Sequence, residues 1–239
     1  MQRILGSVRF LGLVGLLAMV NATLANSEEP QVSRVLTQHE QEALTPEEVS
    51  QLLRTGNQRF MSGTLTSRDH SAQVRDAAGG QFPKAIVLSC VDSRVPVEDV
   101  FDLGIGDIFV ARVAGNFENV DILGSMEFAT KISGAKLILI LGHEDCGAVK
   151  AAIDRAQLGN ITAMLENIKP AAEALSSYKG DQTSANPEFV HLVAAKNVRL
   201  SMRHIRERSP ILKGMEELGQ IKIIGALYDM KSGTVEFLD

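Results

Sequence analysis

Short, wholly apolar runs separated by longer segments constrain the fold of this chain more than any other feature. The runs lie at 85–88, 108–110, 137–141 and 221–227. Strands that are covered on both faces of a parallel sheet have this unbroken apolar pattern. Segments 95–103 and 120–133 are long enough for crossover helices, and a turn at 231–233 returns 234–238 antiparallel. We therefore predict an α/β fold, with a mostly parallel sheet of four strands plus an antiparallel edge strand, flanked by helices.

The N-terminal residues have the pattern of an export signal. Arg3 and Arg9 precede an apolar run at 10–20, and small residues follow up to Ala25. This pattern is typical of a secretory signal peptide, and the run is shorter than the ~20 residues of a membrane-spanning helix. We predict a signal peptide at 1–25, with an uncleaved anchor as the alternative. The mature protein is then periplasmic, or secreted, without stable membrane insertion.

The remaining chain divides into a short arm and one domain. Residues 26–44 are polar and acidic without a clear period, so we expect a loose arm. Thr45, Pro46 and Glu48 form a capping-box pattern that predicts the start of a helix, and the globular domain then spans 45–239. The net charge of −5 becomes −7 if the signal is lost with its two arginines. Such an acidic chain is a poor candidate for binding nucleic acid.

The two cysteines, Cys90 and Cys146, allow two interpretations. In an exported protein, a pair of cysteines suggests one structural disulfide. However, Cys90 directly follows the first predicted strand, while His143 and Cys146 follow the third. If these strands are neighbours, all three side chains converge at the carboxyl edge of the sheet, where such sheets bind ligands. Two thiolates and one imidazole suit Zn²⁺ with an open fourth position.

Asp92 and Arg94, close to Cys90, add groups that a structural metal site does not need. Arg94 can keep Asp92 ionised through a charge-assisted hydrogen bond. Asp92 can then accept the proton of a zinc-bound hydroxide, or become the fourth ligand itself. A plain ion pair that supports the turn is the alternative.

At these residues the sequence resembles the β-class carbonic anhydrases. It contains the Cys-x-Asp-Ser-Arg and His-x-x-Cys motifs of that family at 90–94 and 143–146. The resemblance covers roughly 45–238, and it identifies 45–239 as a catalytic domain. Further matching segments lie at 56–60, 106–110, 112–116, 125–129 and 225–229.

The resemblance implies an enzyme, a carbonate dehydratase of the lyase class. One zinc ion per chain is held by Cys90, His143 and Cys146. Zinc-bound hydroxide, oriented by the catalytic pair Asp92 and Arg94, hydrates carbon dioxide reversibly to bicarbonate and a proton. The resemblance also implies a homodimer or a higher even oligomer.

Three further residues are assigned to substrate binding by the resemblance. Gln81 matches a glutamine of the plant-type members that donates to substrate, and Phe109 matches an aromatic residue of their pocket. Phe128 stands where those members carry tyrosine, so a hydroxyl donor is absent. In some members the aspartate closes the site by binding zinc, and only in that state would Asp92 be a metal ligand. Gln81 and the absence of tryptophan favour the open form.

Two rival functions share parts of this pattern. A hydrolase of carbonyl sulfide or carbon disulfide on the same scaffold would have every motif residue. A non-catalytic zinc-binding protein would need the metal ligands but not the Asp92–Arg94 pair. By residue type alone, the candidates for a proton relay are His39, His70, His191 and His204.

Overall fold

The computed structural model describes residues 31–238, so the predicted signal peptide lies outside the described residues. The elements in chain order are α1 (Gln38–Ala43), α2 (Pro46–Ser62), α3 (His70–Ala77), β1 (Ala85–Ser89), α4 (Val97–Val100), β2 (Ile108–Arg112), α5 (Val120–Glu127), the π-helical turn η1 (Phe128–Ile132), β3 (Leu137–His143), α6 (Gly147–Ile153), α7 (Gly159–Leu165), α8 (Lys169–Glu173), α9 (Pro187–Arg208), α10 (Pro210–Glu217), β4 (Lys222–Tyr228) and β5 (Val235–Phe237).

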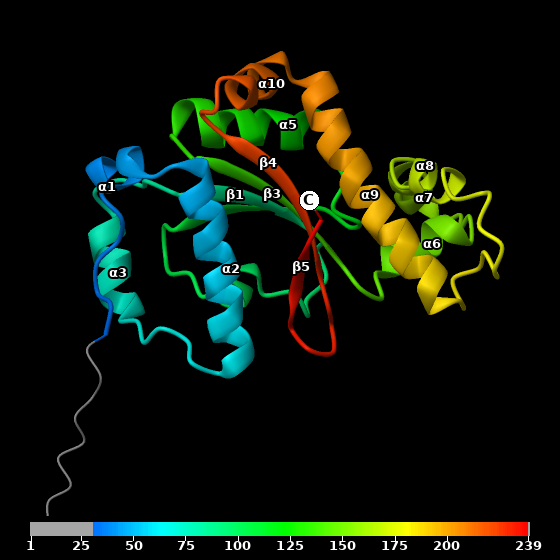
Figure 1. Ribbon diagram of the computed structural model, residues 1–239, viewed down its shortest axis with the longest axis horizontal. Helices are drawn as coiled ribbons and strands as arrows, with labels where there is room; N and C mark the ends of the chain where they lie inside the picture. The colour runs from blue at the N-terminus through cyan, green and yellow to red at the C-terminus, as the bar shows by residue number, and fades with distance from the viewer. Residues whose placement is uncertain (1–30, 239) are drawn as a thin grey trace, which may run out of the picture.

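The five strands form one sheet in the order β2-β1-β3-β4-β5. Strands β1 to β4 are parallel, and β5 pairs antiparallel with β4. The predicted mixed sheet is therefore confirmed, including its antiparallel edge. β1 and β3 are direct neighbours, with Ser89 opposite Leu141. The last residues of these two strands consequently lie at the same edge of the sheet (Figure 1).

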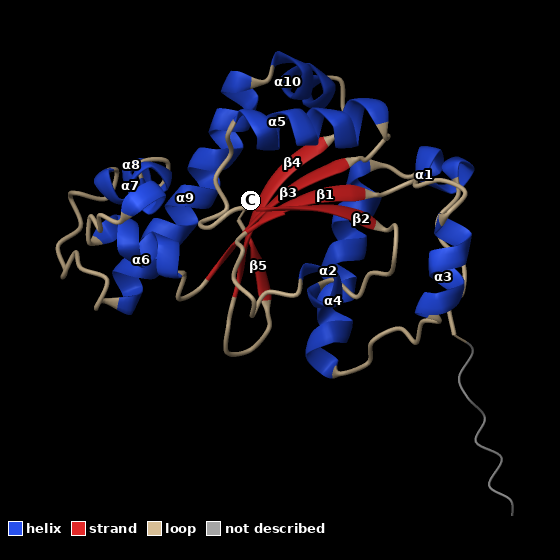
Figure 2. Ribbon diagram, turned by 180° about the vertical axis from the view of Figure 1, so that it is seen from behind, coloured by secondary structure: helices blue, strands red, loops and turns tan. Residues whose placement is uncertain are grey.

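Helices cover both faces of the sheet, and the strand alternation decides which residues meet them. Ile86 and Leu88 of β1 belong to one buried cluster, which also includes residues of α5, α9 and α10. Ala85 and Val87 belong to a second cluster, with residues of α2 and α4. Figure 2 shows α5 and α10 on one side of the sheet and α2 with α4 on the other. This layering buries both faces of the central strands.

β2 differs from the expectation that its run would be covered on both faces. Residues 108–111 are only half-buried and Arg112 is exposed, whereas β1 and β3 are fully buried. The reason is position, because β2 is an edge strand and pairs only with β1. An apolar run alone does not distinguish an edge strand from a central one. The edge of β2 is a surface on which the sheet can be extended.

Two further segments, the N-terminal arm and the crossover after β1, differ from the sequence-based expectation. Part of the expected loose arm is ordered, because α1 has a capping box formed by Thr37 and Glu40. The buried Gln41 side chain then ties α1 to the domain by donating to the carbonyl groups of Pro83 and Ser133, both at 2.7 Å. The crossover predicted at 95–103 contains only the single turn α4.

The predicted start of α2 is confirmed. The Thr45 side chain accepts a hydrogen bond from the Glu48 amide, and Pro46 occupies the first turn. Gly56 lets α2 approach the next layer, since a Cβ atom there would lie 1.9 Å from the carbonyl oxygen of Phe101. α2 thereby packs closely against the end of α4.

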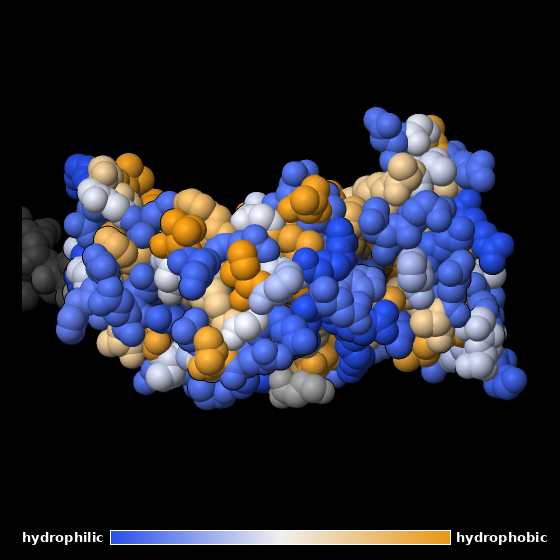
Figure 3. All heavy atoms as spheres, turned by 90° about the horizontal axis from the view of Figure 1, so that it is seen from above, coloured by the Kyte–Doolittle hydropathy of each residue, from blue (hydrophilic) through white to orange (hydrophobic). Residues whose placement is uncertain are grey.

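The outer surface over α10 and α5 is mixed in character. On the face shown in Figure 3, hydrophobic residues stand in small groups among hydrophilic ones. Arg199, Arg203 and Arg208 of α9 are exposed. Among residues 31–238, none of the helices combines the length and the hydrophobicity that crossing a membrane requires.

Candidate metal centre and active site

Three side chains that can bind a metal meet at the carboxyl edge of the sheet. Cys90 directly follows β1, His143 is the last residue of β3, and Cys146 is the N-cap of α6. One donor atom from each lies within 4.8 Å of the others. All three residues are buried, with at most 4% of their surface exposed. The structure therefore brings together the three residues that the sequence predicted to be ligands.

The spacing and hydrogen bonding of these groups fit a zinc ion. The two Sγ atoms are 4.0 Å apart, and two sulfurs of a tetrahedral site with Zn–S near 2.3 Å would be roughly 3.8 Å apart. His143 Nδ1 lies 2.8 Å from the Glu144 carbonyl oxygen. Its buried Nε2 has no hydrogen-bond partner. The imidazole is therefore oriented with one nitrogen free for a metal, as second-shell contacts usually arrange it.

The two cysteines are not joined in a disulfide. Hydrogen bonding from the Cys146 thiol lowers the pKa of Cys90 to about 4, against burial, with smaller contributions from His143 and the Gly115 amide. The neighbouring Cys90 thiolate and burial raise the pKa of Cys146. The lowered pKa favours a thiolate at Cys90, the form that binds metals. The disulfide interpretation leaves His143 and its free nitrogen unexplained.

Asp92 and Arg94 form a bidentate ion pair beside these donors. Arg94 Nε and Nη2 donate to the two Asp92 oxygens at 2.9 and 2.8 Å, and the Arg94 amide adds a third hydrogen bond at 3.0 Å. These bonds hold the pKa of Asp92 well below its usual range, although burial opposes them. Asp92 Oδ2 lies 3.9 Å from His143 Nε2. An ionised carboxylate therefore faces the free imidazole nitrogen.

Arg112, the last residue of β2, holds the loop that carries Cys90 and Asp92. Its Nε donates to the Cys90 carbonyl at 2.8 Å, and its Nη2 donates to the carbonyls of Asp92 and Val95 at 2.6 and 3.1 Å. The sequence reasoning did not assign it a role. Its position in the matching segment 112–116 was the available signal, but spacing does not reveal contacts to backbone carbonyls.

The three predicted substrate-binding residues lie apart from the metal donors of the same chain. Phe109 and Phe128 contact each other edge-to-face, with ring centroids 6.2 Å apart, in a hollow beside β2. Phe109 is opposite Ile86, four residues before Cys90, or ~13 Å along a strand at 3.3 Å per residue. Gln81 is exposed and precedes β1, at the opposite end from Cys90. One chain therefore does not bring these residues to the metal donors.

The histidines outside the centre have different surroundings. His39 and His70 are exposed. His204 Nδ1 lies 3.1 Å from the buried Glu118 carboxylate. His191 Nδ1 lies 2.5 Å from the carboxylate of Glu144, the residue after His143. Of the four candidates for a proton relay, His191 is thus the one that contacts a neighbour of a predicted ligand.

Comparison with known proteins gives one consistent result. The family model described as carbonic anhydrase matches residues 85–235. Carbonic anhydrase 2 of Mycobacterium tuberculosis is 33% identical over 193 residues, which cover 78% of this chain and 90% of that protein. A carbonic anhydrase of Mycolicibacterium smegmatis is also 33% identical, covering 77% and 89% of the two chains.

Solved structures agree with the sequence comparison. The β-carbonic anhydrase CafA of Aspergillus fumigatus is 29% identical, with a TM-score of 0.63, and the match covers 71% of this chain and 82% of that one. The β-carbonic anhydrase CcaA, at 23% identity, shares the fold with a TM-score of 0.63 over 80% of this chain and 95% of that one. With its Cys90–His143–Cys146 group, the chain therefore belongs to the carbonic anhydrase family, in the β class of zinc enzymes.

Proposed function

We propose that this chain hydrates carbon dioxide reversibly at the Cys90–His143–Cys146 centre, with Asp92 and Arg94 as the catalytic pair. The observation that carries the proposal is the position of the Asp92 carboxylate. It is fixed by both guanidinium contacts of Arg94, and it lies 3.9 Å from a buried imidazole nitrogen without a partner. A purely structural metal site has no use for an ionised carboxylate held in this place.

Zinc bound at such a centre supplies a nucleophile at neutral pH, because it lowers the pKa of coordinated water from ~15.7 to ~7. Asp92 is ionised and can only accept hydrogen bonds, so it would orient the attacking group by accepting a hydrogen bond from its O–H. Arg94 keeps that carboxylate in place and charged. With Asp92 held by Arg94, the open form of the site is favoured, in which Asp92 is not itself a ligand.

Carbon dioxide is small and apolar, so its pocket needs apolar walls more than charges. Phe109 and Phe128 provide such walls, and Gln81 provides a donor for bicarbonate. Because these residues lie away from the metal donors of their own chain, we infer that a second copy completes the pocket. The half-exposed β2 edge supports this inference. Val120, Phe128 and Ile132 on the outer side of α5 and η1 are 73%, 50% and 73% exposed, which suits a covered interface.

The site of action remains a proposal from the sequence. We propose that residues 1–25 direct export and are removed, so that the enzyme acts in the periplasm or outside the cell. Residues 45–239 then form the catalytic domain. N-terminal sequencing of the protein isolated from the periplasmic fraction tests export and cleavage, and an intact Met1 in cytoplasmic protein would contradict both.

Stopped-flow measurement of carbon dioxide hydration, with metal analysis of the same sample, tests the proposed reaction. Asp92→Asn should retain one zinc per chain and lose most of the activity. The asparagine amide carries an N–H donor, so it no longer offers a group that only accepts hydrogen bonds. Asp99→Asn, an exposed aspartate of α4, is the matched control and should keep full activity. Full activity in Asp92→Asn, or turnover of carbonyl sulfide without turnover of carbon dioxide, would contradict the proposal.

The inferred pocket between two copies has its own test. Val120→Asp with Ile132→Asp should yield monomers in sedimentation experiments and lose activity, while zinc is retained. Leu158→Asp is the control, because Leu158 is also exposed, at 68%, but lies before α7. A monomer with full activity would show that one chain is sufficient.

A further inference from the structure

A backbone amide points at the sulfur of one predicted zinc ligand. The Gly115 N–H donates to Cys90 Sγ at 3.3 Å, and both groups are buried. Gly115 lies in the turn after β2, with φ of 82°, and the next residue, Asn116, has φ of 40°. Two successive residues in the left-handed region are uncommon, and glycine adopts this region without strain. The turn therefore has a defined shape that directs this amide to the sulfur.

A side chain on α9 holds the turn in that shape. Asn197 Nδ2 donates to the Gly115 carbonyl oxygen at 2.8 Å, across 82 residues of sequence. Asn197 is only 2% exposed, so this hydrogen bond forms away from water. One turn further along α9, Ser201 Oγ lies 3.5 Å from the Asn116 carbonyl oxygen. The long helix α9 thus contacts both left-handed residues.

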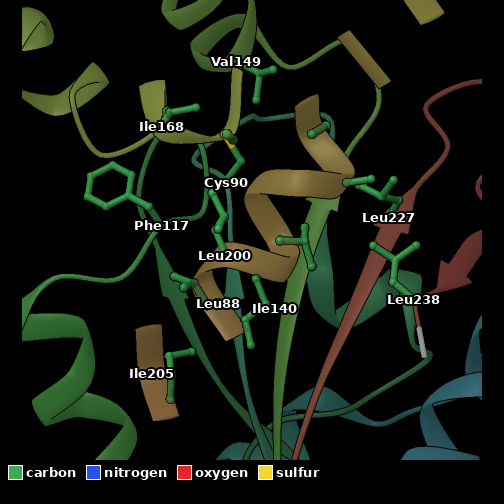
Figure 4. Close-up of a cluster of buried hydrophobic side chains, with 14 of the residues drawn as sticks. Leu88, Cys90, Phe117, Ile140, Val149, Ile168, Leu200, Ile205, Leu227 and Leu238 are labelled. Carbon is green, nitrogen blue, oxygen red and sulfur yellow. The ribbon is translucent and has the colours of Figure 1, made fainter. Parts of the chain in front are cut away.

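Gly115 is tightly packed on the side that faces Ile168 and α6. A Cβ atom on Gly115 would lie 2.3 Å from Cδ1 of Ile168 and 3.4 Å from Cβ of Ala148, next to α6 and Cys146. Ile168 is fully buried. Figure 4 shows Ile168, Val149 and Cys90 in the same buried cluster. This packing leaves no room for a side chain at Gly115, and the hydrogen bond from Asn197 is the directional contact that fixes its carbonyl.

We propose that Asn197 is a positioning residue of the metal centre, which fixes Gly115 so that its N–H donates to the Cys90 sulfur. An N–H donor withdraws electron density from a thiolate and so reduces the charge that the sulfur gives to a bound metal. Hydrogen bonds of this kind tune thiolate-ligated metal centres. The proposal rests on the metal centre of the proposed function, but not on the reaction.

Cobalt(II) in place of zinc provides a spectroscopic test that does not depend on activity. In Asn197→Ala, the released turn should weaken the N–H contact to Cys90. The sulfur then holds its electrons less tightly, and the thiolate-to-cobalt charge-transfer band should move to longer wavelength. Cys90 also loses its fixed position, and this loss outweighs the stronger donation of its sulfur. Zinc affinity, measured by competition with a chromophoric chelator, should therefore fall about 10- to 100-fold. Asn197→Ser, a milder change that also loses the reach to Gly115, gives the same readings if Asn197→Ala does not fold.

Asn57 is the matched control for a general loss of stability. It is also a buried asparagine, and its side chain hydrogen-bonds Val100 and Gly233, at 3.1 and 2.9 Å, and Val235 rather than the turn at Gly115. Asn57→Ala should lower stability but keep the parental cobalt band. Folded Asn197 variants with the parental band and affinity would overturn the proposal. Parent protein without any thiolate–cobalt band would overturn both the metal centre and this proposal.

Discussion

Two buried polar clusters in this chain are built in opposite ways. Around Asp102, whose side chain is fully buried, the acceptors are saturated. Arg59 and Arg68 donate to its carboxylate at 2.5 and 2.6 Å, and Thr66 donates through both its amide and its hydroxyl. At the metal centre, by contrast, His143 Nε2 has no partner and two sulfurs face each other without a bond.

The contrast distinguishes a cluster that stabilises the fold from a cluster whose donor atoms are free to bind a ligand. A buried polar atom without a hydrogen bond costs about 1–3 kcal/mol. The Asp102 cluster avoids this cost entirely within the chain. At the metal centre, the unpaired His143 Nε2 atom carries this cost, and metal binding removes it. Removing a residue should therefore change stability in the first cluster, and metal content with activity in the second.

The largest effect is expected at the metal centre. Cys146→Ser replaces a thiolate with a hydroxyl group, which is a poor ligand for Zn²⁺. We expect bound zinc and carbon dioxide hydration to be lost together. Metal analysis by mass spectrometry and stopped-flow kinetics on the same preparation measure both. If Cys146→Ser retains stoichiometric zinc, Cys146 is not a ligand and the contrast between the clusters fails.

The corresponding change in the other cluster is Asp102→Ala. It leaves Arg68 and Arg59 without their buried partner, so the free energy of unfolding should fall by about 3 kcal/mol. Zinc content should stay at the parental value. Urea unfolding followed by circular dichroism measures the loss. A variant that keeps its stability but loses zinc would reverse the roles assigned to the clusters.

Lowering the pH should remove the stability that the Asp102 cluster contributes in the unmodified protein. Burial raises the pKa of Asp102, but hydrogen bonds from Thr66, Arg59 and Arg68 outweigh it and lower the pKa to about 2. In the unfolded chain the value is ~3.9. The resulting stability, about 2–3 kcal/mol, is present above pH ~4 and is lost as the pH falls toward 2.

Urea unfolding of the parent and of Asp102→Asn between pH 6 and 3 tests this prediction. The metal ligands are common to both proteins, so the difference between them isolates Asp102. The stability advantage of the parent should shrink as the pH falls. A difference that stays constant down to pH 3 would mean that Asp102 titrates at its ordinary pKa.

The smallest effect is expected from one donor of the saturated cluster. Thr66→Val removes the hydroxyl that donates to Asp102 Oδ2 at 2.6 Å, while both arginines remain. We expect a loss of about 1.5 kcal/mol, the lower range for a hydrogen bond to a charged group. Thermal unfolding monitored by circular dichroism measures it. A loss as large as that of Asp102→Ala would show that the arginines alone do not hold the carboxylate.

Much of the fold was predictable because it depends on local patterns. The apolar runs predicted β1, β3 and β4, and the capping box at Thr45 predicted the start of α2. The ordered arm was missed because Gln41 is held by the carbonyls of Pro83 and Ser133, which are distant in sequence. The half-exposed state of β2 was missed because edge position is a property of the sheet and not of the strand.

The candidate site was predictable to a similar degree. Cys90, His143 and Cys146 each follow a strand, so a parallel sheet with β1 beside β3 brings them together. The supporting residues were not predictable in this way. Arg112 and Asn197 act through backbone carbonyl groups, and such contacts leave no spacing or pattern in the sequence.

By itself, the sequence determined the α/β class, the family and the three side chains of the metal centre, because strand patterns and ligand types are local properties. Only the tertiary structure decided how far apart the donor atoms lie, which imidazole nitrogen stays free, and which helix holds the turn beside Cys90. Those features depend on contacts between residues up to 85 positions apart, and packing alone brings such residues together.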